Sequence, residues 1–218
     1  MKHLSLRESA YNIIKSKLLN HEFEPGSRIR EDLLAEEISM SRTPVREAIN
    51  QLSTEGLIEN IPRKGLFFIE LQPEEIIGLL EVREVIERLA IEKCIEKINS
   101  EQIRTLKSIL EKTEYELSVE NYKECNELDS KFHREISLIS GNGKIVKFLS
   151  EIEDYMKLAR FIEKKTFAKE KVQTAISEHR EILDAIVKKD CEAAARAMKK
   201  NIETMKSNLN ITPRATKK

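Results

Sequence analysis

Three side chains that can hydrogen-bond to other molecules, Arg42, Arg46 and Asn50, follow one another at intervals of four residues. Residues spaced in this way lie on one face of an α-helix. Guanidinium and amide groups on such a face suit guanine and adenine edges in a DNA major groove, and the hydroxyl groups of Ser41 and Thr43 suit phosphate oxygens. Most arginines on a helix are simply solvated, so the neighbouring segments must decide between the two interpretations.

The segments on either side have the order of a winged helix-turn-helix. The stretch 31–38 predicts a short helix and the next two residues a tight turn; Ser41 or Thr43 can then cap the second helix by accepting from its free N–H groups. Two β-rich runs follow, 57–61 and 66–70, joined by a basic turn that contains Arg63, Lys64 and Gly65. A hairpin at this place is the wing of such a domain. The whole order predicts DNA binding.

A second group of residues could bind a metal ion. Asp129 and His133 are four residues apart on a predicted helix, so a carboxylate and an imidazole share one face and can hold one divalent cation. His179 lies on another predicted helix, on the side of its core-facing neighbours. A single histidine is more often a buried or surface residue than a ligand.

Residues 5–70 resemble the DNA-binding domain of the GntR family of bacterial transcriptional regulators. The matching stretches are Pro25-Gly26, Glu31 with Leu34-Ala35, Ser41-Arg-Thr-Pro-Val-Arg-Glu-Ala48, Leu52, Glu55-Gly-Leu57 and Gly65. Several relatives carry an arginine where this chain has Asp32, whose charge repels phosphate and speaks against that contact here. The remainder is similar to the all-helical FCD type of effector domain, in the shorter six-helix version of the VanR branch.

The FCD resemblance implies a metal site and an effector. FCD domains commonly hold a metal with one Asp and three His; Asp129, His133 and His179 fall at three of these positions, whereas Asn201 stands at the fourth. One divalent metal, zinc or nickel, is therefore implied. Because an amide oxygen is a weaker ligand than imidazole for these metals, a metal-free site is the other outcome. The implied effector is a small organic acid, with Arg83 and, less strongly, Arg160 to bind its carboxylate; a plain ion pair with Glu87 is the alternative role for Arg83.

The fold predicted from helical period and cap chemistry is mostly α. We expect a winged helix-turn-helix of three helices and a hairpin over residues 1–71, an antiparallel six-helix bundle over 72–210, and a disordered tail over 211–218. The bundle helices are predicted at about 73–98, 99–118, 120–140, 144–163, 169–188 and 191–209. The apolar stripe expected to be buried in the first of them consists of Ile76, Leu79, Leu80, Val82, Val85, Ile86 and Leu89.

Composition bounds the partners and the compartment. The formal net charge of the 218 residues is zero, and the first 70 carry 10 Lys and Arg (4 Lys, 6 Arg) against 11 Asp and Glu. DNA affinity must then come from a few local cations, so two copies acting together, a homodimer, are expected. No apolar run is long enough to cross a membrane, and Cys94, Cys125 and Cys191 are interpreted as reduced, packed thiols, which predicts a cytoplasmic protein.

These observations predict a ligand-responsive regulator that binds a palindromic DNA operator as a dimer, with repression relieved by the ligand. One alternative is a metal-dependent hydrolase that uses Asp129, His133 and His179, but no general base or nucleophile accompanies these residues. Another is a helical adaptor whose winged helix binds protein.

Overall fold

The computed structural model describes residues 4–159 and 169–208. These residues form two compact units, one that contains the chain up to Gln72 together with the end of a later helix from Asp154, and one that contains the rest. Arg160, predicted to bind the effector, and the segment 211–218, predicted to be a disordered tail, lie outside the described residues.

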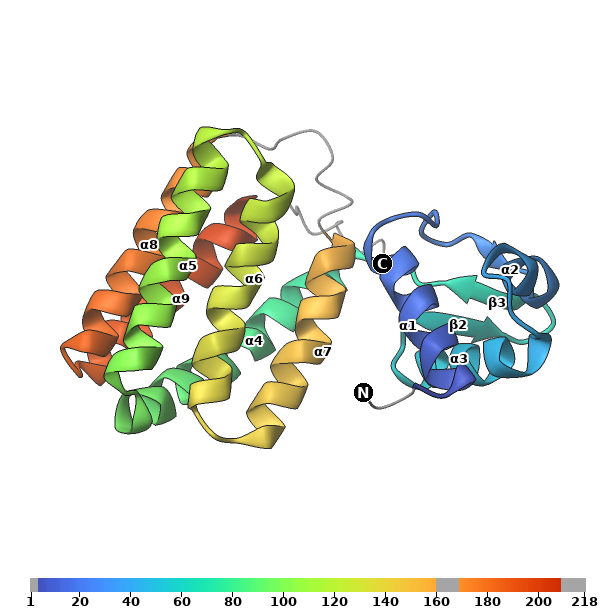
Figure 1. The fold of residues 1–218 in the computed structure, drawn as a ribbon, viewed down its shortest axis with the longest axis horizontal. Coiled ribbons are helices and arrows are strands. Elements are labelled where there is room, and N and C mark those ends of the chain that lie inside the picture. The colour runs from blue at the N-terminus through green and yellow to red at the C-terminus, as the bar shows by residue number, and fades with distance from the viewer. Residues whose placement is uncertain (1–3, 160–168, 209–218) are drawn as a thin grey trace, which may run out of the picture. The chain divides into compact units, whose positions relative to one another are not determined.

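The first unit is a winged helix-turn-helix (Figure 1). Its elements are α1 (Leu6–Leu19), β1 (Arg28–Ile29), α2 (Glu31–Glu37), α3 (Arg42–Thr54), β2 (Ile58–Ile61) and β3 (Gly65–Phe68). The strands form an antiparallel sheet in the order β1-β3-β2, so the predicted hairpin is present and gains a two-residue strand that the sequence did not indicate. The predicted three helices and wing are confirmed.

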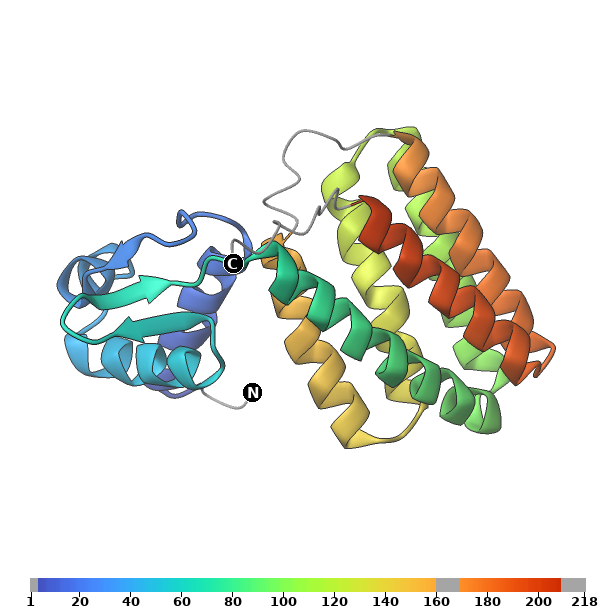
Figure 2. The same ribbon diagram turned by 180° about the vertical axis from the view of Figure 1, so that it is seen from behind.

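The six helices predicted for the bundle are present, and the second unit contains them except for the end of the fourth one from Asp154. They are α4 (Pro73–Lys97), α5 (Ser100–Ser118), α6 (Tyr122–Ile139), α7 (Gly143–Ala159), α8 (Lys169–Val187) and α9 (Cys191–Asn208). Within the bundle α8 packs on α9 and α5, and α4 packs on α6 and α9; Figure 2 shows α4 and α9 side by side. In the ranges that the structure describes, no helix has the length and apolarity to cross a membrane.

The buried face of α4 differs from the prediction. Val82, Val85 and Leu89 are exposed, Val85 to 70%. The charged residues Arg83 and Glu87 occupy the inward positions instead. The helix carries apolar residues around most of its circumference, so its hydrophobic pattern could not fix the orientation. The buried charges can occupy the inward positions because they pair with each other, and an apolar strip faces outward.

The cysteines are free, as expected, but only two of them are packed. Cys94 and Cys125 are buried, whereas Cys191, the first residue of α9, is exposed, contrary to the prediction. Burial raises the pKa of Cys94 to about 12, so that thiol stays protonated and unreactive.

Candidate nucleic-acid interface and candidate metal centre

Helix α3 separates its apolar and polar residues into two faces. Its buried residues are Pro44, Val45, Ala48, Ile49 and Leu52. The residues predicted to meet DNA, namely Ser41, Arg42, Thr43, Arg46 and Asn50, are all exposed. Ser41 occupies the N-cap position, but no side chain within the described ranges caps this helix, so the predicted capping hydrogen bond is wrong. The first N–H groups of α3 thus lack a side-chain acceptor, and such groups bind phosphate well.

Arg46 is held in place by an acid from the preceding helix. Its Nε and Nη2 atoms each lie 2.9 Å from Oε2 of Glu31, while the arginine side chain is 64% exposed. This contact fixes the guanidinium and leaves its other N–H groups free to face a ligand. Glu31 is a residue that sequence reasoning missed in this role. Asp32, the departure from the family pattern, is paired with Arg30 at 3.0 Å.

The wing turn places two cations in solvent. Arg63 and Lys64 are exposed, and the N–H of Lys64 donates to the Ile61 carbonyl at 3.0 Å to close the turn. Arg63 has a φ of 65° and Gly65 a φ of 108°. Glycine adopts such angles freely, but a long side chain at positive φ costs on the order of 1 kcal/mol. Arg63 therefore lies at a strained position of an exposed turn.

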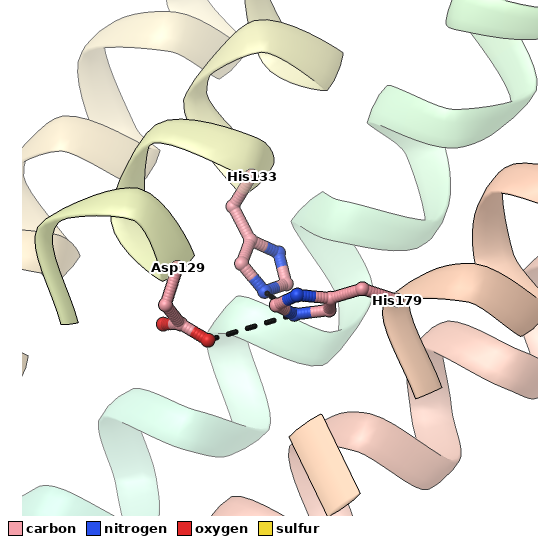
Figure 3. A group of neighbouring side chains, drawn as sticks. All are labelled: Asp129, His133 and His179. Atoms are coloured by element: carbon pink, nitrogen blue, oxygen red, sulfur yellow. Dashed lines mark hydrogen bonds and ion pairs between the residues drawn. The ribbon is translucent and has the colours of Figure 1, made fainter. Parts of the chain in front are cut away.

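The structure brings Asp129 and His133 of α6 together with His179 of α8 (Figure 3). The Nε2 atoms of the two histidines are 3.2 Å apart, and Nε2 of His179 lies 3.5 Å from Oδ1 of Asp129. One ligand atom from each residue lies within 4.8 Å of the others. Two imidazoles and one carboxylate that converge in this way fit a divalent cation.

The charge state of the His179 ring also suits a metal ligand. Burial lowers the pKa of His179 to about 4, so this ring is neutral at physiological pH and can offer its lone pair without first losing a proton. Phe132 stacks on the ring, with centroids 4.4 Å apart, and fixes its plane. The His179 ring is therefore already held in the plane and the neutral state that a metal ligand requires.

A buried ion pair on α4 supports the His133 side. Oε1 of Glu87 lies 2.9 Å from Nδ1 of His133 and 3.3 Å from Nε of Arg83. Nδ1 of His133 has no hydrogen-bond partner among the described residues, so its attraction to this carboxylate is electrostatic. A carboxylate on this side favours the proton on Nδ1 and leaves Nε2 for a ligand. Sequence reasoning treated Glu87 only as an ion-pair partner of Arg83 and missed this role.

Arg83 interacts electrostatically with three carboxylates, one of which belongs to the candidate metal ligand Asp129. Burial by itself would lower its pKa, but the carboxylates of Glu87, Glu153 and Asp129 raise it overall. Burial would likewise raise the pKa of Glu87, but His133 and Arg83 outweigh it and the pKa is lowered. Both members of the pair are therefore charged although they are almost fully buried. The two roles considered for Arg83 are compatible, since the paired guanidinium lies beside the candidate ligands.

The fourth predicted ligand, Asn201, lies on the buried stripe of α9. Its Nδ2 donates to Oε2 of the buried Glu178 at 3.0 Å. Its Oδ1 is buried and has no hydrogen-bond partner within the described part of the chain. Glu178 is another acid that the sequence analysis did not single out.

Known proteins match both units. Residues 6–68 match the family model described as bacterial regulatory proteins of the gntR family, and residues 78–204 match the FCD domain. The HTH-type transcriptional regulator YdhC of Bacillus subtilis is 31% identical over 187 residues, which are 84% of this chain and 82% of that protein. The gluconate operon transcriptional repressor of the same species is 26% identical over 200 residues, 90% of this chain and 82% of that protein. The solved structure of E. coli McbR/YncC has a TM-score of 0.84 at 20% identity and covers 95% of this chain and 98% of its own. By its DNA-binding and effector domains together, this chain belongs to the GntR family of bacterial transcriptional regulators and carries an FCD effector domain.

Proposed function

We propose that this GntR-family regulator binds a palindromic operator as a homodimer and releases it when a small carboxylate enters the FCD bundle. The observation that carries the proposal is the exposed polar face of α3, formed by Arg42, Arg46 and Asn50. The hydrolase alternative is not supported, because the relatives are named transcriptional regulators. The same names speak against the adaptor. The gluconate operon relative is named a repressor, and for this chain we likewise propose repression rather than activation.

In the proposed complex, α3 enters the major groove. Arg42 and Arg46 contact bases or phosphates, and Ser41 and Thr43 contact phosphate together with the uncapped N–H groups of the helix. Arg63, Lys64 and Gly65 bring the wing to the backbone or the minor groove. Two such helices related by a two-fold axis match half-sites one helical turn apart, roughly 34 Å, or closer.

The outward apolar strip of α4 supports the homodimer. Val82, Val85 and Leu89 are 52%, 70% and 43% exposed. Exposed apolar residues grouped on one helix face are typical of an interface, and a two-fold axis would place this strip against its own copy. A dimer also doubles the small number of cations available to each operator.

Val85→Glu tests the dimer. The new carboxylate would be desolvated in each of two copies, at a cost on the order of several kcal/mol per copy, so we expect the dimer to dissociate at micromolar concentration and operator affinity to fall with it. Analytical ultracentrifugation measures the first effect and fluorescence anisotropy the second. Val119→Glu, the same change at a valine that is 54% exposed elsewhere in the bundle, is the control. A Val85→Glu protein that remains dimeric would exclude this strip as the interface.

For the effector we propose that Asp129, His133 and His179 hold one divalent metal, zinc or nickel, and that Arg83 lies beside the bound acid. The metal would act as a Lewis acid that anchors a carboxylate oxygen of the effector. The effector can shift the protein from its DNA-binding arrangement to its released arrangement only by the difference between its affinities for the two. That difference is typically about 1–3 kcal/mol.

Elemental analysis of the purified full chain checks the metal. We expect close to one equivalent of zinc or nickel in the wild type, and none in the His133→Ala/His179→Ala double variant, which retains Asp129 but loses both imidazoles. Thermal unfolding with and without a chelator gives a second readout, because a ligand that binds the folded state raises Tm. Wild-type protein that arrives empty and takes up neither added ion would refute the metal proposal.

A further inference from the structure

Arg28, on the short strand β1, lies on the outer face of the three-stranded sheet. In the antiparallel register it stands opposite Phe67 of β3. Successive side chains of a strand point to opposite faces, so the buried side chain of the next residue, Ile29, marks the core face, and Arg28 points away from the core. Arg28 is exposed and has no hydrogen bond or ion pair in the part of the chain that the structure describes. Its guanidinium is therefore available to a partner molecule.

The guanidinium of Arg28 reaches the basic turn of the wing. A Cβ atom placed on Gly65 would lie 3.4 Å from Nε and 3.5 Å from Nη2 of Arg28. These are contact distances, so the guanidinium lies directly beside the backbone of Gly65, which has no side chain to cover it. Arg63 and Lys64 immediately precede this glycine and are exposed. A residue more than thirty positions earlier in the sequence thus adds a cation to the turn.

The outer face of the sheet also carries an acid, but this acid does not pair with Arg28. Glu59 of β2 stands opposite Phe67 as well, on the other side of the central strand β3. Two strand spacings, roughly 10 Å, therefore separate the backbones of Glu59 and Arg28. Like charges gathered at one turn repel one another in the free protein. An anionic partner would relieve that repulsion, and DNA is the anionic partner of this domain.

We propose that Arg28 binds a phosphate of the DNA backbone beside each half-site, as a third cation of the wing next to Arg63 and Lys64. The inference rests on the operator binding of the proposed function and adds a contact from outside both the recognition helix and the hairpin. Arginine suits this partner because its planar fork of N–H groups matches two phosphate oxygens. A phosphate contact fixes the position of the protein on the duplex and adds affinity without reading the sequence.

Fluorescence anisotropy of Arg28→Ala over a series of salt concentrations tests the contact. The probes are DNA from the promoter region of the regulator's own gene and an unrelated fragment of the same length. Each lost phosphate contact should reduce the slope of log affinity against log salt by about 0.9, and a dimer loses two. We expect affinity for both fragments to fall by roughly tenfold or more at about 0.1 M salt. The ratio of the two affinities should keep its wild-type value.

Two further variants are the controls. Arg28→Lys keeps the positive charge and should recover most of the affinity and of the salt dependence. Arg104 of α5 is likewise exposed and without an ion pair among residues 4–159 and 169–208. Arg104→Ala therefore removes the same charge from the effector domain and should leave the affinity for both fragments unchanged. The Tm of Arg28→Ala should equal that of the wild type, because the side chain forms no hydrogen bond or ion pair within the described residues.

The outcomes separate this contact from operator binding itself. An Arg28→Ala protein with wild-type affinity and salt dependence would overturn the role of Arg28, while wild-type binding to the promoter DNA would leave the proposed function intact. A loss confined to the promoter DNA would also overturn the phosphate contact, because it would show that Arg28 reads a base. Wild-type protein that fails to bind the promoter DNA would remove the proposed function.

Discussion

Arg46→Ala should reduce affinity for DNA from the promoter region of the regulator's own gene by at least roughly 30-fold. The loss of an arginine that contacts a base edge costs about 1–3 kcal/mol, and a two-fold dimer loses that contact twice. The variant should also discriminate less between this DNA and an unrelated fragment, because base contacts carry the sequence information. Fluorescence anisotropy with the promoter DNA and with the unrelated fragment measures both the affinity and the discrimination.

Arg196→Ala is the matched control for that measurement. Arg196 lies on α9, its side chain is 70% exposed against 64% for Arg46, and each arginine is paired with a glutamate. The two variants lose the same charge, so only a specific contact can separate them. Glu31→Ala then shows whether the ion pair orients Arg46 or competes with DNA for it. Full affinity in Arg46→Ala would overturn the assignment of α3 as the recognition helix.

The fold could be predicted wherever the signals were local. The turn between α2 and α3 and the basic turn between β2 and β3 are set by neighbouring residues, and the structure contains both. Strand β1 was missed because a two-residue strand is defined only by its pairing with Phe67 and Leu66, far along the chain. The outward strip of α4 was missed for a related reason: its orientation depends on which buried charges find partners on other helices.

The candidate site shows the same division. Asp129 and His133 could be paired from their spacing on one helix, and His179 was added through the family resemblance. The acids that contact the candidate site residues were missed: Glu31 pairs with Arg46, Glu87 lies against His133, and Glu178 accepts from Asn201. They belong to a chain with 38 Asp and Glu, and nothing in their local sequence separates them from solvated ones. Their roles arise from contacts between helices, which a single sequence does not specify.

Glu87→Leu should produce the largest loss of stability, lowering the free energy of unfolding by about 3–5 kcal/mol. The variant leaves the guanidinium of Arg83, which is 3% exposed, buried without its paired carboxylate. Urea unfolding of the metal-free protein measures the change. The corresponding control is Arg88–Glu92, a pair with the same spacing and a contact of 3.2 Å but with both side chains exposed. Glu92→Leu should change stability by less than about 1 kcal/mol, because exposed pairs contribute little.

Adding Arg83→Met to Glu87→Leu separates the structural role of the pair from its functional one. Stability should largely return, since a buried ion pair replaced by apolar residues of similar size is often neutral or better. Metal affinity should not return with it, because His133 has lost the carboxylate beside Nδ1; a deficit of about 10–100-fold is typical of such a loss. A double variant that recovers both stability and metal binding would show that Glu87 serves only to neutralise Arg83. Recovery of stability alone would assign Glu87 to the metal centre as the group that orients His133.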